Sequence, residues 1–202
     1  MKHFLIILLL FSTPAYCQNE EIYKLTFSDT SNFRLLTYLD HTQPPKYVII
    51  DTTGLWRTNR FWLKELDDKS VQQIKRMQAA EHHPYNHTYL FKDTTLDRII
   101  SDSGKMSLSS YAGNLKSKKL TLKGKNYSTI SSSRNIKGFY FLATEPIITY
   151  DMKYAFIDIV VCYKDKQKQD LNETYFGTIC VIYEKQQDNK WKKIKVKNHL
   201  IL

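Results

Sequence analysis

Between Gly138 and Lys197 the chain concentrates β-branched and aromatic residues, and this run limits the possible folds more than any other feature. Its two richest stretches, Tyr154–Tyr163 and Thr174–Tyr183, carry the side chains that fit a pleated, half-buried strand. Residues 164–173 between them are almost entirely polar, so an antiparallel hairpin is the simplest connection. Trp191–Val196 then alternates apolar with basic residues, which predicts a third strand.

Strand-forming residues also precede this hairpin. Phe139–Ala143 and Pro146–Tyr150 have strand composition on either side of a break near Glu145, which predicts one interrupted strand. Tyr150–Lys153 would then turn the chain back into the hairpin. The expected result is an antiparallel meander of about four strands, where three or more are needed for an independently stable sheet.

The order of these features resembles a group of small secreted proteins from Bacteroidota-type bacteria. The resemblance covers residues 139–197 and rests on strand patterns. In chain order they are a turn with Asp151 and Lys153, the strand Ala155–Tyr163, a second strand bearing Cys180, and a closing strand that begins with Trp191-Lys192. That group has no assigned activity, so the resemblance implies secretion and a sheet but assigns no functional residue.

The N-terminus has the pattern of a secretory signal peptide. Lys2 and His3 precede the apolar run Phe4–Phe11, and a short segment of mostly small residues leads to a cleavage site after Cys17. The apolar run is too short to span a bilayer. We therefore expect residues 1–17 to be removed and the remaining chain to be periplasmic or secreted, with no transmembrane segment.

Cys17 permits a second interpretation of the same residues. It could be the lipidated first residue of a lipoprotein, anchored to a membrane. The bulky Tyr16 lies where such signals have a small residue, which favours plain cleavage.

Residues 18–202 are predicted to form one α+β domain, because their length suits one domain and no linker interrupts them. Apolar residues at helical spacing occur in the N-terminal half, broken at Ser28–Asn32, and Lys46–Asp51 has strand composition. The predicted fold is a helical N-terminal half with one or two short strands, packed on the C-terminal antiparallel meander.

The net charge of +10 is concentrated in one serine- and lysine-rich segment, residues 104–138, which holds eight basic and no acidic residues. Such a segment could attract an acidic protein or an anionic envelope polymer. A solvated loop is the alternative interpretation. Nucleic acid is not expected, because no recognised binding motif accompanies the lysines. The candidate binding residues are Lys116, Lys118, Lys119, Lys123 and Lys125.

His82, His83 and His87 are the strongest metal-ligand candidates, because three imidazoles within six residues could converge on zinc or copper. Their spacing is not that of a His-Glu-x-x-His helix, and Pro84 excludes a regular helix through them. We therefore favour a solvated histidine-rich loop and expect no metal or other cofactor.

Trp56 and Trp62 are the two tryptophans of an aromatic cluster in the N-terminal half of the sequence. They could be a platform for a sugar or an apolar ligand. We favour burial between a strand and a helix, since tryptophan is highly buried on average.

Cys162 and Cys180 lie on the two strands that we pair as a hairpin. If they face each other, residues 169–173 form the connecting loop, and an oxidising compartment permits a disulfide between them. The hypothesis is a cross-strand disulfide that fixes the register, and two buried thiols are the alternative.

Catalytic motifs do not occur in the sequence: it has no Gly-x-Ser-x-Gly elbow, phosphate-binding glycine loop or His-Glu-x-x-His. We therefore expect a non-enzymatic exported protein that binds a macromolecule, such as an envelope-protective immunity or inhibitor protein. The alternative is a small hydrolase or ligand-binding protein that uses the His82–His87 loop and the region of Trp56 and Trp62.

Overall fold

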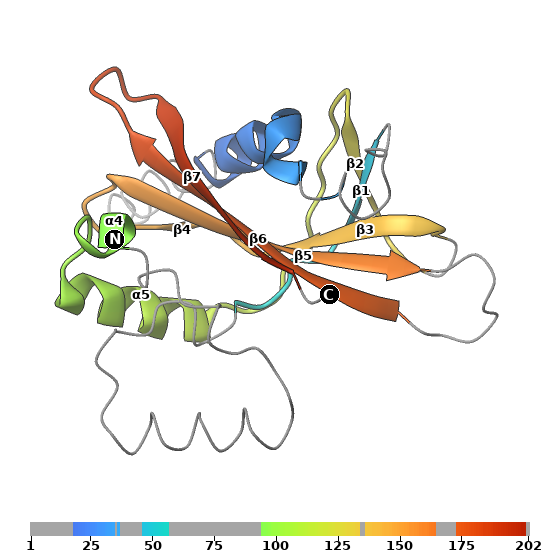
Figure 1. Ribbon diagram of the computed structural model, residues 1–202, viewed down its shortest axis with the longest axis horizontal. Helices are drawn as coiled ribbons and strands as arrows, with labels where there is room; N and C mark the ends of the chain where they lie inside the picture. The colour runs from blue at the N-terminus through green and yellow to red at the C-terminus, as the bar shows by residue number, and fades with distance from the viewer. Residues whose placement is uncertain are drawn as a thin grey trace, which may run out of the picture.

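A single mixed sheet organises the computed structural model, which describes residues 18–34, 36, 46–56, 94–133, 136–164 and 173–200. In this part of the chain the sheet has seven strands in the order β2-β1-β3-β5-β6-β7, with β4 also paired to β5 (Figure 1). The strands are β1 (Tyr47–Ile50), β2 (Tyr127–Ile130), β3 (Gly138–Ala143), β4 (Ile147–Ile148), β5 (Tyr154–Lys164), β6 (Glu173–Lys185) and β7 (Trp191–Leu200).

The C-terminal half of the sheet is the predicted antiparallel meander. Strand β5 pairs antiparallel with β6, and β6 with β7. Strands β3 and β4 both pair antiparallel with β5, at opposite ends of it, and they are separated at Glu145 as the sequence predicts. Pro146 has no N–H to offer a ladder, which explains the break. Met152, with φ 59°, completes the turn from β4 into β5.

The N-terminal contribution to the sheet differs from the prediction. Strand β1 pairs parallel with both β2 and β3, so it is built into the sheet instead of belonging to a separate half packed against it. Strand β2 comes from the basic segment, for which a solvated loop was one of the two interpretations of the sequence. The observed fold is therefore α+β with a mixed sheet that ends in an antiparallel meander.

One face of the sheet is covered by the helical residues 18–28 and by the short helix η1 (Thr30–Phe33). Phe33 is fully buried, and its ring centroid lies 4.3 Å from that of Tyr47 and 5.4 Å from that of Phe141. Full burial of an aromatic side chain of this size stabilises the fold by about 1.5–3 kcal/mol. The buried residues on this face, which pack β1 and β3 against the helical residues 18–28 and η1, form the first core.

Helices α4 (Thr94–Asp97) and α5 (Asp102–Asn114) cover the opposite face, as the blue and green helices in Figure 1 show. Successive residues of a strand point to opposite faces. Accordingly Ala155 and Ile157 of β5 belong to the first core, whereas Phe156 packs in the second core with buried residues of α4, α5 and β6. These second-core residues are Leu96, Leu108, Ala112, Cys180 and Ile182. No helix in the described part of the chain is long and apolar enough to cross a membrane.

Helix α5 corrects the interpretation of residues 104–138 as a solvated loop. Its 13 residues include four serines and two glycines, and its apolar residues form only a weak stripe, so the pattern did not predict a helix. The helix begins because the Ser101 hydroxyl accepts a hydrogen bond from the Gly104 amide at 3.2 Å. A Cβ at Gly104 would lie 2.7 Å from Ile100, so glycine permits the close approach.

The predicted disulfide between Cys162 and Cys180 is wrong in this structure. The register of β5 and β6 places Asp158, not Cys162, opposite Cys180. Cys162 lies opposite Tyr175, beyond a β-bulge after Val161. The predicted register was therefore four residues off, and both cysteines are buried as thiols, as the alternative interpretation had it.

Candidate functional site

The predicted lysine segment is an extended strand-like stretch that follows α5. The amide of Thr53 donates to the Lys118 carbonyl at 2.8 Å, and the Leu120 amide donates to the Asp51 carbonyl at 2.6 Å. Leu120 and Leu122 are 7% and 6% exposed and belong to the first core. Because neighbouring side chains of an extended chain point to opposite sides, the buried leucines direct their neighbours outward.

This alternation places Lys119 and Lys123 outward, and Lys125 lies in the bend that follows Lys123. We call these three residues the lysine row. All three are exposed. Lys123 pairs antiparallel with Ser128 in a tight hairpin, in which the Gly124 amide donates to the Tyr127 carbonyl at 3.0 Å. Since alternate residues of an extended chain are about 7 Å apart, Lys119 and Lys123 are spaced by about 13 Å along the segment.

Two other lysines of the basic segment have acidic partners from outside the segment. Lys118 Nζ lies 2.9 Å from the Glu145 carboxylate. Lys105, whose side chain is 4% exposed, lies 2.6 Å from Asp97. The Lys105 ammonium is therefore buried in its ion pair, whereas the Lys118 side chain is 60% exposed and pairs with Glu145 at the surface of the protein.

The exposed lysines of the segment are in a different situation. Lys119 approaches Asp51 at 4.0 Å with its side chain 81% exposed, so this pair contributes little. Lys116, Lys123 and Lys125 are exposed and have no ion pair with any residue that the structure describes. The lysine row and Lys116 thus keep their charges available, whereas the charge of Lys118 is paired with Glu145 although its side chain is 60% exposed.

Lys118 points into a groove that the sequence did not predict. The groove, of about 1220 Å³, lies between α5, the turn from β4 to β5, and the start of the helical residues 18–28. Its wall on α5 is formed by Ser103, Ser107 and Tyr111. These residues are spaced by four, so their side chains follow one line along the helix.

Glu145 is the polar centre of the groove, and its side chain is only 14% exposed. Besides Lys118, the Asn19 amide donates to its carboxylate at 3.4 Å. The Trp56 indole donates to its backbone carbonyl at 2.7 Å. Trp56 itself is 5% exposed, which confirms the core interpretation for this residue. No local pattern in the sequence indicates the groove, because its walls are far apart along the chain.

A buried tyrosine lies beside Glu145. The Tyr23 hydroxyl donates to the Thr144 carbonyl at 3.0 Å. Burial, and secondarily the Glu145 charge, raises the pKa of Tyr23 well above its usual value. Tyr23 is therefore a neutral hydrogen-bond donor that holds the chain next to Glu145.

Several predicted residues lie outside the described part of the chain: the candidate metal ligands His82, His83 and His87, as well as Trp62 and the signal segment 1–17 with Cys17. Among the residues that are described, no three His, Cys, Asp or Glu side chains gather as a metal site would require.

Comparison of the chain with protein-family models, with curated proteins and with solved structures finds no match. The resemblance to small secreted proteins therefore stays a prediction.

Proposed function

We propose that this chain is an exported, non-enzymatic protein that binds an acidic protein or an anionic envelope polymer through the lysine row. The observation that carries the proposal is the fixed outward direction of Lys119 and Lys123, whose neighbours Leu120 and Leu122 are buried in the core. A row held by a packed segment loses less conformational entropy on binding than a mobile loop would.

The spacing of the row suits a linear partner. Successive carboxylates along an extended chain could meet lysines about 7–13 Å apart without bending. Each exposed pair would contribute little alone, so such recognition needs several charges acting together. A protein that protects the envelope by covering an acidic surface of its target, as immunity and inhibitor proteins do, would need this binding and no chemistry.

The rival explanation is that these lysines protect the edge of the sheet from pairing with another copy of the protein. Strand β2 is an outer strand of the described sheet, and its hairpin carries Lys123 and Lys125. Lysines on edge strands discourage pairing between copies of a protein. On that explanation, removing the two charges would cause self-association and would not weaken binding to any partner.

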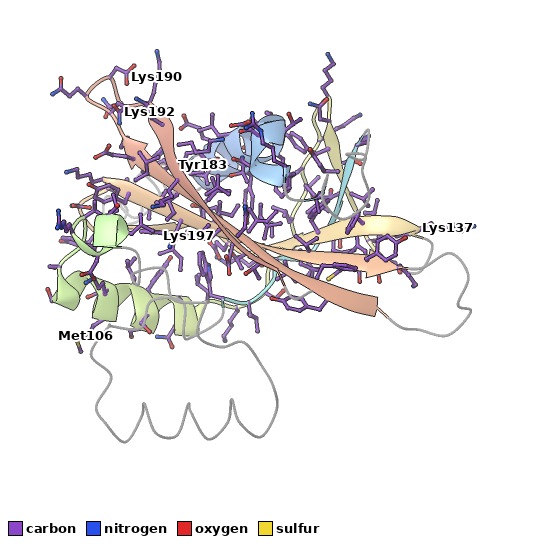
Figure 2. All side chains as sticks on the ribbon, viewed as in Figure 1. Met106, Lys137, Tyr183, Lys190, Lys192 and Lys197 are labelled. Atoms are coloured by element: carbon purple, nitrogen blue, oxygen red, sulfur yellow. The ribbon has the colours of Figure 1, made fainter. Side chains whose placement is uncertain are left out.

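The test compares two variants with the same change in net charge. Lys123→Gln/Lys125→Gln removes charge from the row, and Lys190→Gln/Lys192→Gln removes it from the tip of the β6–β7 hairpin, where Figure 2 shows these lysines. Binding to immobilised polyglutamate and to alginate, a carboxylate polysaccharide, is measured at low and high salt. The two polymers distinguish a peptide-like from a polysaccharide partner.

At about 0.5–1 kcal/mol for each exposed pair, the row variant should bind about 5- to 30-fold more weakly than the wild type at low salt. The hairpin variant should bind as the wild type does. All binding should weaken as salt rises, because salt screens exposed charges. Equal losses in the two variants would show attraction by net charge alone, and binding to neither polymer would contradict the proposal.

A further inference from the structure

The groove around Glu145 has features that the lysine row does not explain. Tyr111 and Tyr150 line it and are 52% and 105% exposed. Met152, also in its lining, is 40% exposed. Single exposed apolar residues are normal, but three of them around one groove form a surface suited to a ligand.

The charged side chains of the described lining already have partners. Lys118 is paired with Glu145. The Asp151 carboxylate accepts hydrogen bonds from the Thr149 hydroxyl at 2.5 Å and from the Lys153 amide at 3.1 Å. The hydrogen bond from Thr149 lowers the pKa of Asp151, with further support from Lys153. An ionic ligand would therefore have to disturb an existing pair, whereas a neutral ligand would not.

Polar groups in the groove remain available for neutral hydrogen bonds. The Gln18 Oε1 atom is buried and has no hydrogen-bond partner within the described part of the chain. A buried acceptor without a donor costs free energy, which a ligand O–H or N–H would recover. The Ser107 hydroxyl donates to the Ser103 carbonyl at 3.0 Å and can still accept a hydrogen bond. A purely apolar ligand would leave these groups unpaired.

We propose that this groove binds a neutral oligosaccharide. A sugar ring has an apolar C–H face, which can lie against a tyrosine ring, and a rim of hydroxyls that donate and accept hydrogen bonds. Tyr111 and Tyr150 offer the ring faces. Gln18, Asn19 and Ser107 offer complementary polar atoms, and the Asp151 carboxylate has a second oxygen that can accept from a hydroxyl.

The shape of the groove also favours a sugar chain over a peptide. Its volume, about 1220 Å³, exceeds the roughly 300–1,000 Å³ of typical small-molecule pockets, so several sugar units fit. An extended peptide is usually held by main-chain hydrogen bonds to a sheet edge. The strand next to the groove, β4, has only two residues and can supply few such bonds.

The experiment is a calorimetric titration of the whole protein with maltohexaose, cellohexaose and chitohexaose at concentrations up to the millimolar range. At least one of them should bind. Tyr111→Ala and Tyr150→Ala should each weaken that binding about tenfold, as loss of an aromatic anchor does. Both residues are exposed, so neither variant should disturb folding, and circular dichroism checks this.

Met106→Ala is the matched control, because Met106 is 63% exposed on α5 but does not line the groove, and Figure 2 shows it pointing away from the sheet. Sugar binding should be unchanged in this variant and in Lys123→Gln/Lys125→Gln, so the groove and the lysine row are tested separately. The proposal is wrong if none of the three sugars binds, or if the tyrosine variants bind as the wild type does. Neutral hexapeptides that bind in a Tyr111-dependent way would show that the groove is instead a peptide site.

Discussion

The ion pair between Lys105 and Asp97 leads to a prediction about stability in which the two partners are not equivalent. We expect Asp97→Asn to destabilise the fold clearly and Lys105→Met to leave it nearly unchanged. The Lys105 side chain is 4% exposed, whereas that of Asp97 is 29% exposed. Removing the carboxylate takes a charged partner, 2.6 Å away, from a buried ammonium. Removing the ammonium leaves a carboxylate that can still reach water.

The magnitudes follow from this difference in burial. Removing one partner of a fully buried ion pair costs about 3–5 kcal/mol. Because Asp97 is partly solvated, we expect about 2–3 kcal/mol for Asp97→Asn. Lys105→Met keeps most of the apolar stem and removes the desolvated charge. The free energy of unfolding of this variant should therefore lie within about 1 kcal/mol of the wild type.

The assay is urea unfolding followed by circular dichroism, supported by thermal unfolding. For a domain of this size, 2–3 kcal/mol corresponds to a fall in Tm of about 4–12 °C. The exposed ion pair Lys24–Glu20 gives the control: its side chains are 59% and 48% exposed, so Glu20→Gln should cost less than about 0.5 kcal/mol. The reasoning is refuted if Asp97→Asn costs no more than Glu20→Gln, or if Lys105→Met costs as much as Asp97→Asn.

Two further predictions concern Asp29, the N-cap residue of η1, and the cysteines. Burial alone would raise the pKa of Asp29, but hydrogen bonds from Lys193 and Ser31 outweigh it and hold the pKa below its usual value. The stability that this carboxylate contributes is therefore complete above about pH 5 and is lost as the pH falls through its folded pKa. The stability difference between the wild type and Asp29→Asn should accordingly shrink below about pH 4 in acid unfolding series. For Cys162 and Cys180, alkylation of the unfolded protein should give the same mass with and without prior reduction, and a mass difference would restore the disulfide hypothesis.

The sequence predicted best where local composition determines the structure. The dense β-branched and aromatic content of β5 and β6 leaves no helical alternative, and the polar residues between them indicate the hairpin. Pro146 likewise fixes the break between β3 and β4. These features depend on residues close together in the chain, so one sequence is enough to identify them.

The errors arose where distant segments meet. Parallel pairing of β1 with β2 and β3 depends on long-range contacts that no local pattern encodes. The predicted connection, residues 169–173, was too short, because the described pairing of β5 with β6 reaches only to Lys164 and Glu173. The β-bulge after Val161 shifts the register by one further residue. Helix α5 is stabilised by its cap and by burial against the sheet more than by helix propensity, so its serines and glycines suggested a loop.

The candidate sites show the same difference between features set by local composition and features set by long-range contacts. The exposed lysines were identified from charge alone, but their grouping depends on which side of one extended segment each occupies. Lys118 and Lys119 are exposed neighbours, yet Lys118 is paired with Glu145 at the groove and Lys119 lies on the row. A count of charges cannot separate them, whereas the burial of Leu120 and Leu122 does.

The two proposed sites should respond differently to salt. Binding at the lysine row depends on charges that remain exposed to the solvent, so ionic strength should weaken it over the range in which the Debye length falls from about 30 Å to about 8 Å. Binding in the groove involves charges that are already paired within the protein and a ligand that carries none. Its affinity should therefore change little over the same range. A chain that bound both ligands with the same salt dependence would be using one surface for both, and the separation of Lys118 from Lys119 would then have no functional meaning.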